Sequence, residues 1–261
     1  MYIALTVAGS DSGGGAGIQA DLKTFHQLGV YGTSVITAIT AQNTLGVSRW
    51  EAVSAEMVRA QLDAVATDLR PRAFKTGMLA DAGIVRAVAA GAREHELSGY
   101  VLDPVMVATS GDVLIEHDAV AAIREHLLPL CAVVTPNAHE AALLAGLAVE
   151  TEADLAKAAE ALVRELGAGA ALVKGGHVDT GAETVDVLYA DGAAVAFRNR
   201  RLATTSTHGT GCTLSAAIAA ELAKGNDLRA ACARAVEFVH RAIEAAPGLG
   251  SGHGPLNHFV R

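Results

Sequence analysis

Cysteine is scarce in this chain, and no long apolar run is present. The three cysteines, Cys131, Cys212 and Cys232, are widely spaced and odd in number. This excludes a disulfide framework and favours a reducing compartment. No apolar stretch is long enough to span a bilayer, and residues 1–9 lack the basic segment of a signal peptide. We therefore expect a cytoplasmic protein with no membrane partner.

Basic residues are also few, since 20 Lys and Arg stand against 28 Asp and Glu, a formal net charge of -8. An acidic protein repels phosphate backbones unless it carries a concentrated basic patch. The densest basic run, at residues 198–201, is equally explained as a solvated strand end. We expect no nucleic-acid partner.

Hydrophobic residues, in contrast, make up 51% of the 261 positions, enough for a large core. No linker, internal repeat or low-complexity segment divides the sequence. We therefore expect residues 1–261 to form a single domain, since α/β folds of this size are often one domain.

Short β-rich apolar runs alternate with segments of helical periodicity along most of the chain. We expect strands at residues 3–8, 35–38, 73–76, 100–102, 131–135 and 171–174, and helices at 18–28, 57–69, 84–92, 120–128, 155–166, 214–223 and 228–245. This alternation predicts an α/β fold with a mostly parallel central sheet and helices on both faces. The Asp-Gly dipeptide at 191–192, between runs at 185–189 and 194–197, predicts a small antiparallel edge.

Six residues of different chemical types stand at or just past the carboxyl ends of expected strands. They are Gly9, Gln42, Met78, Asp103, Asn137 and Lys174. Open α/β sheets bind ligands in the crevice at the carboxyl ends of their strands. The pattern predicts a ligand site at that edge, although unrelated turns would also carry polar residues.

Two glycine-rich stretches, at residues 9–17 and 206–215, each run directly into a helix-like segment. Such a junction leaves backbone N–H groups free at the positive end of the helix dipole, which suits it to hold an anion. A flexible turn is the alternative for the first loop. No P-loop consensus occurs, and the dinucleotide-like pattern at 15–20 lacks the acid expected after the second strand, which argues against a Rossmann dehydrogenase.

Cys212 stands at the start of the helix that follows the second loop. There the dipole is expected to favour the thiolate, which would serve as a base toward a substrate hydroxyl. The alternative is a small buried residue, which is the usual fate of a free cysteine. We expect Cys131 and Cys232 to lie in the core.

Lys174, followed by two glycines, is suited to nucleotide phosphates, unless it is an ordinary surface lysine. Asp103 and Glu140 supply the oxygen ligands that a hard cation prefers. Glu140 would alternatively stabilise the first turn of its own helix.

Together these motifs resemble the ribokinase superfamily, and within it the hydroxymethylpyrimidine/phosphomethylpyrimidine kinase family of thiamin biosynthesis. The similar segments are residues 8–21, 40–44, 75–79, 103–105, 135–137, 173–177, 208–212 and 252–258. Each motif is modest alone, but their order and spacing over nearly the whole chain are specific.

The resemblance implies a ribokinase-like kinase that uses ATP and Mg2+. Its substrate would be 4-amino-5-hydroxymethyl-2-methylpyrimidine and then the monophosphate of that compound. The implied anion hole is Gly209, Thr210, Gly211 and Cys212, with Cys212 as the base and Lys174 in a catalytic role. Asn137, Lys174, Thr207 and Gly209 would bind ATP, and Asp103 and Glu140 would serve the magnesium ion.

The implied pyrimidine pocket is formed by Gly9, Asp21, Gln42, Met78 and Val105. Gln42 has both a donor and an acceptor for an aminopyrimidine edge, and Met78 and Val105 are suited to cover the ring. Asp21 would alternatively be an exposed helix charge. The resemblance also favours a homodimer. A pyridoxal or pyridoxine kinase and a non-catalytic pyrimidine-binding protein remain open as alternatives.

Overall fold

The computed structural model describes residues 1–106 and 117–260. Its strands are β1 (Ile3–Ala8), β2 (Tyr31–Ile36), β3 (Ala38–Asn43), β4 (Gly46–Ala52), β5 (Ala73–Thr76), β6 (Tyr100–Leu102), β7 (Val133–Val134), β8 (Ala171–Lys174), β9 (Glu183–Ala190) and β10 (Ala193–Arg200). Its α-helices are α1 (Gly17–Gln27), α2 (Ala55–Asp68), α3 (Ala82–Glu94), α4 (His117–Ala122), α5 (Ala138–Ala145), α6 (Glu152–Arg164), α7 (Thr210–Ala223) and α8 (Leu228–Glu244).

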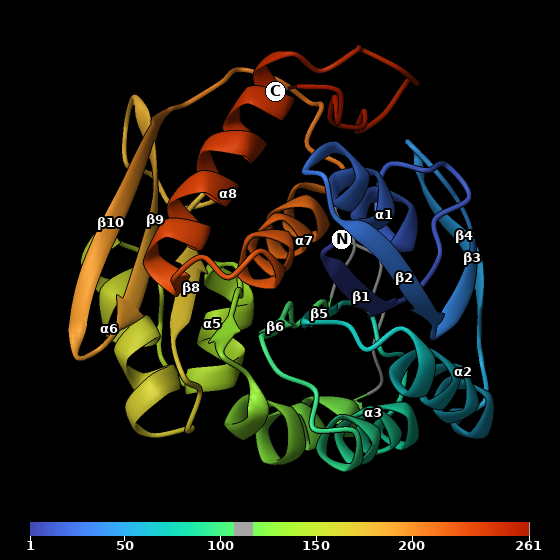
Figure 1. Ribbon diagram of the computed structural model, residues 1–261. Helices are drawn as coiled ribbons and strands as arrows, with labels where there is room; N and C mark the ends of the chain where they lie inside the picture. The colour runs from blue at the N-terminus through green and yellow to red at the C-terminus, as the bar shows by residue number, and fades with distance from the viewer. Residues whose placement is uncertain (107–116, 261) are drawn as a thin grey trace.

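Eight strands form one sheet in the order β10-β9-β8-β7-β6-β5-β1-β2. The strands from β8 to β2 in this order run parallel, whereas β9 and β10 run antiparallel to their neighbours. Helices α1, α7 and α8 cover one face of the sheet, and α2, α3, α5 and α6 cover the other (Figure 1). The predicted α/β fold with an antiparallel edge is confirmed.

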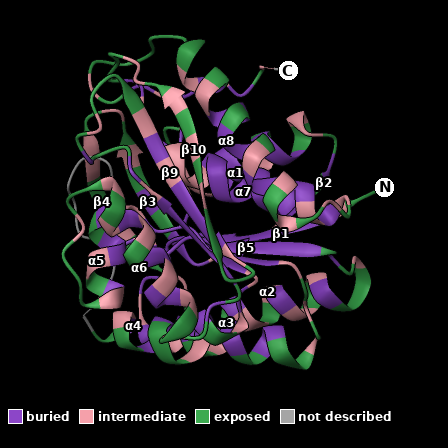
Figure 2. Cartoon of the chain, turned by 90° about the vertical axis from the view of Figure 1, so that its left-hand side faces the viewer, coloured by how far each residue is buried: buried purple, intermediate pink, exposed green. Residues whose placement is uncertain are grey.

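Helix α7 occupies the middle of its layer, between α1 and α8, and packs on β1, β5 and β6 (Figure 1). It is buried almost all round because its sequence is a run of small and apolar residues, among them Ala216, Ala217, Ala219 and Ala220. Small side chains let neighbouring backbones approach closely. Figure 2 shows how burial is distributed over the whole molecule: the strands at the centre are buried, and the exposed residues lie on the outer faces of the helices. The start of α7 is therefore held in a fixed place relative to the sheet.

A second sheet, the antiparallel hairpin of β3 and β4, was not predicted. The strand expected at residues 35–38 instead ends with β2 at Ile36, and β3 begins at Ala38. Between them Thr37 turns the chain: its N–H donates to Ala8 O (3.0 Å) and its hydroxyl donates to Met78 O (2.5 Å). Burial alternates along β3, but polarity does not follow it, because Ile39 is exposed and Thr40 is buried, so the sequence gave no clear strand signal.

The helix expected at 120–128 is also different. It is α4 followed by a π-helical turn (Ile123–Leu127) and a 3-10 turn (Leu128–Leu130). Pro129 lies inside the last turn and has no N–H to continue a helical ladder. Among the described residues, no helix has both the length and the apolar character needed to cross a membrane.

Candidate active site

Five of the six expected strand-end residues do lie at the carboxyl edge of the main sheet. Gly9 follows β1, Met78 lies just past β5, Asp103 follows β6, Asn137 follows β7, and Lys174 ends β8. The expectation for Gln42 was wrong in one respect, because that residue lies inside the β3–β4 hairpin. The edge is the crevice at which open α/β sheets bind ligands.

Gln42 nevertheless approaches the same region through its main chain. Its N–H donates to Ser12 Oγ (2.8 Å), and the Ser12 hydroxyl donates to Gln42 O (2.7 Å). A β-carbon on Gly9 would lie 3.2 Å from Met78 Sδ, so these two residues adjoin. Val105 lies just past β6, where its N–H donates to Asp103 O (2.8 Å), and it is half-buried against the core. Four of the five residues expected for the pyrimidine pocket thus lie around one end of the sheet.

The second glycine-rich loop, residues 207–212, is called the anion loop below. Gly209 is the N-cap of α7 and has φ +85°, a left-handed conformation that glycine adopts without strain. Thr210 closes the turn, because its hydroxyl donates to Thr207 O (2.7 Å). Within the described parts of the chain, no acceptor meets the N–H groups of Gly211 and Cys212. These two amides are available to an anion, as predicted for a helix N-terminus.

Lys174 and Asp103 lie directly beside these amides. A β-carbon on Gly211 would lie 3.1 Å from Lys174 Nζ and 3.5 Å from Asp103 Oδ2. Lys174 Nζ also forms an ion pair with Asp103 Oδ1 (3.2 Å), and the Ser215 hydroxyl donates to Asp103 Oδ2 (3.3 Å). The absence of a side chain at Gly211 therefore leaves room where a lysine, a carboxylate and free amides meet.

Glu140 stabilises the first turn of α5, which is the alternative role considered from the sequence. It forms a capping box with Asn137: the Asn137 N–H donates to Glu140 Oε2 (2.8 Å), and the Glu140 N–H donates to Asn137 Oδ1 (2.9 Å). Burial raises the pKa of Glu140 to about 7; the nearby Lys174 lowers it and Asp103 raises it further. A buried carboxyl with a raised pKa beside a lysine is a candidate member of a functional site.

Cys212 does not have the lowered pKa expected from the helix dipole. Burial raises the pKa of its thiol to about 12, and the neighbouring Asp21 and Asp103 act in the same direction. The Lys75 ammonium and the Gly17 N–H oppose this shift but do not reverse it. The thiol is therefore protonated at neutral pH in the ligand-free protein. Cys131 and Cys232 are buried, as expected.

A buried ion pair lies under the site and was missed by the sequence analysis. Lys75 Nζ lies 3.1 Å from Asp21 Oδ2, and the Thr6 hydroxyl donates to the same oxygen (2.6 Å). Both charged side chains have 0% exposed surface. Asp21 thus presents no surface to a pyrimidine, and the lysine within the apolar strand Ala73–Thr76 was the only local sign of such a pair.

The first glycine-rich loop, residues 9–17, does not offer its amides to a ligand as expected. The Asp11 carboxylate already accepts the N–H groups of Gly13 (2.7 Å), Gly15 (2.9 Å) and Ala16 (2.8 Å). The Asp11 carboxylate therefore takes the place that the sequence analysis expected a bound anion to occupy. We call residues 9–17 the substrate loop, because Gly9 and the Ser12 contact to Gln42 belong to it.

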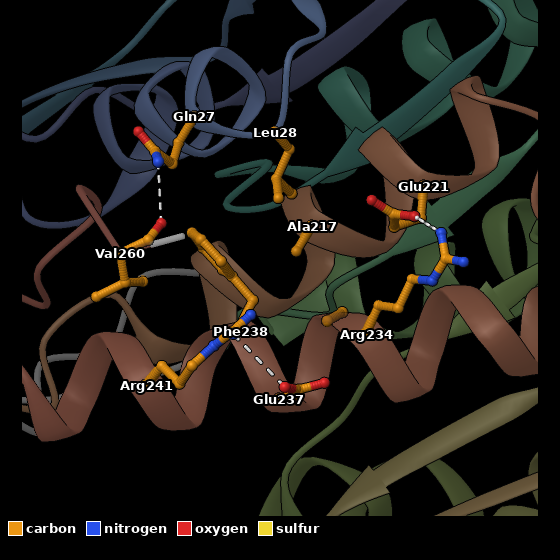
Figure 3. Close-up of a pocket in the computed structure, with 10 residues that line it drawn as sticks. Gln27, Leu28, Ala217, Glu221, Arg234, Glu237, Phe238, Arg241 and Val260 are labelled. Carbon is orange, nitrogen blue, oxygen red and sulfur yellow. Dashed lines mark hydrogen bonds and ion pairs between the residues drawn. The ribbon is translucent and has the colours of Figure 1, made fainter.

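A cavity of about 400 Å³ lies elsewhere. It opens between α1, α7 and α8 near Val260, and Figure 3 shows the ion pairs of Glu221 with Arg234 and of Glu237 with Arg241 at its rim. None of the expected site residues lines it. The cavity contacts the C-terminal half of α7, through Ala217 and Glu221, whereas the anion loop leads into the N-terminus of that helix.

Phosphoryl transfer depends on positioning and on neutralising the charge of the moving group. Two free amides at the start of a helix, next to a lysine and a carboxylate at the edge of this sheet, meet that requirement. The fold and the site therefore define a ribokinase-like kinase.

A family model described as phosphomethylpyrimidine kinase matches residues 11–257. The chain belongs to this family. It is 56% identical to a hydroxymethylpyrimidine/phosphomethylpyrimidine kinase of Rhizobium meliloti (strain 1021), in an alignment covering 99% of this chain and 97% of that protein. Identity to the protein of the same name in Bacillus subtilis (strain 168) is 47%, over 100% of this chain and 96% of that protein.

Solved structures agree with the fold. An ADP complex of Bacillus subtilis pyridoxal kinase superposes with a TM-score of 0.91 at 39% identity, covering 99% of this chain and 97% of that one. A phosphomethylpyrimidine kinase from Clostridium difficile 630 superposes with a TM-score of 0.83 at 37% identity, covering 93% of this chain and 100% of that one.

Proposed function

We propose that this protein transfers the terminal phosphoryl group of ATP to 4-amino-5-hydroxymethyl-2-methylpyrimidine, and then a second one to the resulting monophosphate. The observation that carries the proposal is the space at Gly211, where Lys174 Nζ, Asp103 and the free amides of the anion loop meet. The relatives named above as hydroxymethylpyrimidine/phosphomethylpyrimidine kinases support the choice of substrate.

The nucleotide phosphates bind between the anion loop and the end of β8. Lys174 neutralises their charge, and the Gly211 and Cys212 amides bind the group that moves. Thr207 and Asn137 complete this side of the site. The neighbouring structures solved with ADP support ATP as the donor.

Mg2+ fits the donor set that this chain provides. Asp103 and Glu140 are buried carboxylates near Lys174, and Mg2+ is commonly held by one or two carboxylates together with substrate phosphates. Among the described residues no group of three His, Cys, Asp or Glu forms a self-sufficient metal site. When bound with ATP, the ion supplies further charge neutralisation at the phosphates.

The pyrimidine lies against Gly9, Met78 and Val105, with Gln42 reaching it from the hairpin. Its hydroxymethyl group then faces Cys212, whose thiolate form acts as the base in the first transfer and takes up the hydroxyl proton. Asp21 acts indirectly, by holding the Lys75 ammonium near Cys212.

The test is an assay of the purified protein with MgATP and the pyrimidine, in which the mono- and diphosphate are separated and quantified. Both products are expected. Absence of product at both steps would exclude the proposal. Calorimetry that showed pyrimidine binding without nucleotide binding would instead support the non-catalytic alternative.

Pyridoxal is the second candidate substrate, because several structural neighbours are pyridoxal kinases. Specificity is the ratio of the kcat/KM values for the two compounds. We expect the larger kcat/KM for the pyrimidine. A larger value for pyridoxal would reverse the assignment.

We also propose that the protein is a cytoplasmic homodimer. The three free cysteines suit a reducing compartment. Sedimentation equilibrium at micromolar concentration measures the mass directly, and a mass near 26.6 kDa would contradict the dimer.

A further inference from the structure

The two glycine-rich loops are joined by one buried contact that the proposed chemistry does not use. His208 Nε2 lies 2.8 Å from Asp11 Oδ2, and the two side chains are 9% and 1% exposed. Since a carboxylate only accepts hydrogen bonds, His208 is the donor. His208 immediately precedes Gly209, the first residue of the turn that presents the free amides.

Asp11 is held in place from several sides. Its carboxylate accepts three N–H groups of the substrate loop, and its own N–H donates to Gln19 Oε1 (2.8 Å). Burial raises the pKa of Asp11, but the hydrogen bonds from His208, Ala16 and Gly13 outweigh it and leave the pKa below its usual value. Asp11 is therefore a charged and well-satisfied anchor.

The backbones of the loops also touch at this place. A β-carbon on Gly209 would lie 1.9 Å from Gly15 O, and one on Gly15 would lie 2.6 Å from His208 Cδ2. His208 is braced from its other side as well, because its N–H donates to Gly254 O (3.1 Å). A shift of the His208 ring would therefore move Gly209 relative to the substrate loop.

We propose that Asp11 and His208 are a positioning pair that fixes the anion loop against the substrate loop. The inference rests on the proposed kinase function. Neither Asp11 nor His208 is among the residues assigned above to the pyrimidine or to ATP. The pair keeps the amides of Gly211 and Cys212 aimed at one point, so that no rearrangement is needed when charge develops on the transferred group. Preorganised donors of this kind contribute through the transition state more than through substrate binding.

The decisive comparison is between His208→Gln, which keeps an N–H donor, and His208→Met, which fills a similar volume without one. We expect His208→Met to lower kcat for the pyrimidine by ~10 to 100-fold, the effect of a displacement of about 1 Å. The KM for the pyrimidine should stay within about twofold. His208→Gln should regain most of the kcat, because the contact to Asp11 is restored.

A matched control exists on the other face of the sheet. His95 Nε2 lies 2.7 Å from Asp63 Oδ1, between α2 and the end of α3. His95→Met removes the same kind of contact away from both loops and should leave kcat unchanged. A purely structural role for His208 would lower the thermal stability of His208→Met without a selective loss of kcat.

A second measurement does not depend on activity. Hydrogen exchange of the ligand-free protein, followed on a peptide covering residues 206–213, should be faster in His208→Met than in wild type and unchanged in His95→Met. If wild type forms no product while this exchange difference is seen, the kinase assignment fails and the positioning pair stands.

Three results would overturn the pair. They are a kcat of His208→Met within about twofold of wild type, a Gln variant as impaired as the Met variant, and unchanged exchange at 206–213. Should His208→Met lack a cooperative thermal transition, Asp11→Asn takes its place in the same assays. That variant keeps the shape of residue 11 but removes its charge, and its kcat within twofold of wild type would equally contradict the proposal.

Discussion

Lys75 and Asp21 form an ion pair in which neither side chain has any exposed surface, and their charged atoms are 3.1 Å apart. Burial opposes the charge on Lys75, but the nearby Asp21, Cys212 and Asp103 raise its pKa, so the ammonium persists. The pair thereby holds the Lys75 ammonium close to Cys212, where the ammonium favours the thiolate against burial and against the opposing effect of Asp21.

The first prediction concerns this pair. Lys75→Met should lower the free energy of unfolding by about 3–5 kcal/mol, because it leaves Asp21 buried without its partner. Urea denaturation at pH 7 measures the change. Adding Asp21→Asn to Lys75→Met should recover part of the loss, whereas two independent residues would give additive losses.

The second prediction separates the two transfers. In the first, an alcohol must lose a proton; in the second, the acceptor is a phosphate oxygen that is already ionised at neutral pH. Cys212→Ser should therefore lower kcat of the first transfer by ~10²–10⁴-fold, the usual contribution of a general base. The second transfer should change far less.

The same prediction extends to the direction in which kcat/KM of the first transfer changes with pH. Because the pKa of the Cys212 thiol is raised to about 12, the thiolate fraction grows with pH throughout the neutral range. The kcat/KM of the first transfer should rise with pH in wild type and lose this rise in Cys212→Ser. Equal losses in both transfers, or an unchanged pH profile, would mean that sulfur only lines the anion loop.

The third prediction uses two glycines with similar backbones. Gly209 has φ +85° and a β-carbon there would lie 1.9 Å from Gly15 O, whereas Gly225 has φ +89° and open space around it. Gly225→Ala should cost only about 1 kcal/mol of stability, the price of a left-handed alanine. Gly209→Ala should cost more and should also lower kcat by ~10²-fold, because the loop amides are displaced.

Stability and activity of the two alanine variants are compared by thermal denaturation and by steady-state kinetics. Equal kcat values for Gly209→Ala and Gly225→Ala would show that the anion loop tolerates displacement and that the close approach of the two loops is unimportant.

The fourth prediction concerns His258, whose Nε2 lies 3.0 Å from Thr213 Oγ1 at the start of α7. Burial, with a smaller contribution from Lys23, lowers the pKa of His258 from 6.5 to about 4. Between these values the unfolded chain binds more protons than the folded one, so stability is lost as pH falls from 6.5 toward 4. The loss amounts to at most about 3 kcal/mol.

His258→Gln keeps a polar group near Thr213 but cannot titrate, so its unfolding free energy should fall less over this pH range. Replacement of the exposed His26 by Gln provides the control and should leave the wild-type slope. A slope in His258→Gln equal to that of wild type would contradict the prediction.

The local pattern of the sequence predicted the main sheet well. The bounds of β5, β6 and β8 agree with the expectation, because each is a short apolar run with a clear break on either side. The β3–β4 hairpin escaped prediction because β3 exposes Ile39 and buries Thr40, against the usual polarity, and because its turn, at residues 44–45, has no Asn-Gly or Asp-Gly signal.

The site was predicted in part, for a related reason. Lys174, Asp103 and the anion loop are each marked by local sequence, so their convergence followed from the topology of the sheet. The partners of Lys75 and Asp11 lie far away in sequence, and nothing local indicates them. The same limit explains why the expected low pKa of the Cys212 thiol was wrong. The sequence shows that Cys212 stands at a helix start, but it does not show the distant residues that bury the thiol and raise its pKa.

The contact between Asp11 and His208 spans 197 positions in the chain. Closing so long a loop costs more entropy than closing the local turns within each βαβ unit, so long-range contacts of this kind slow folding. The helices and the sheet can therefore gain their hydrogen bonds before the two glycine-rich loops meet. A molecule caught at that stage would have a native-like circular dichroism spectrum and no competence for phosphoryl transfer, which makes the return of activity the last event of refolding.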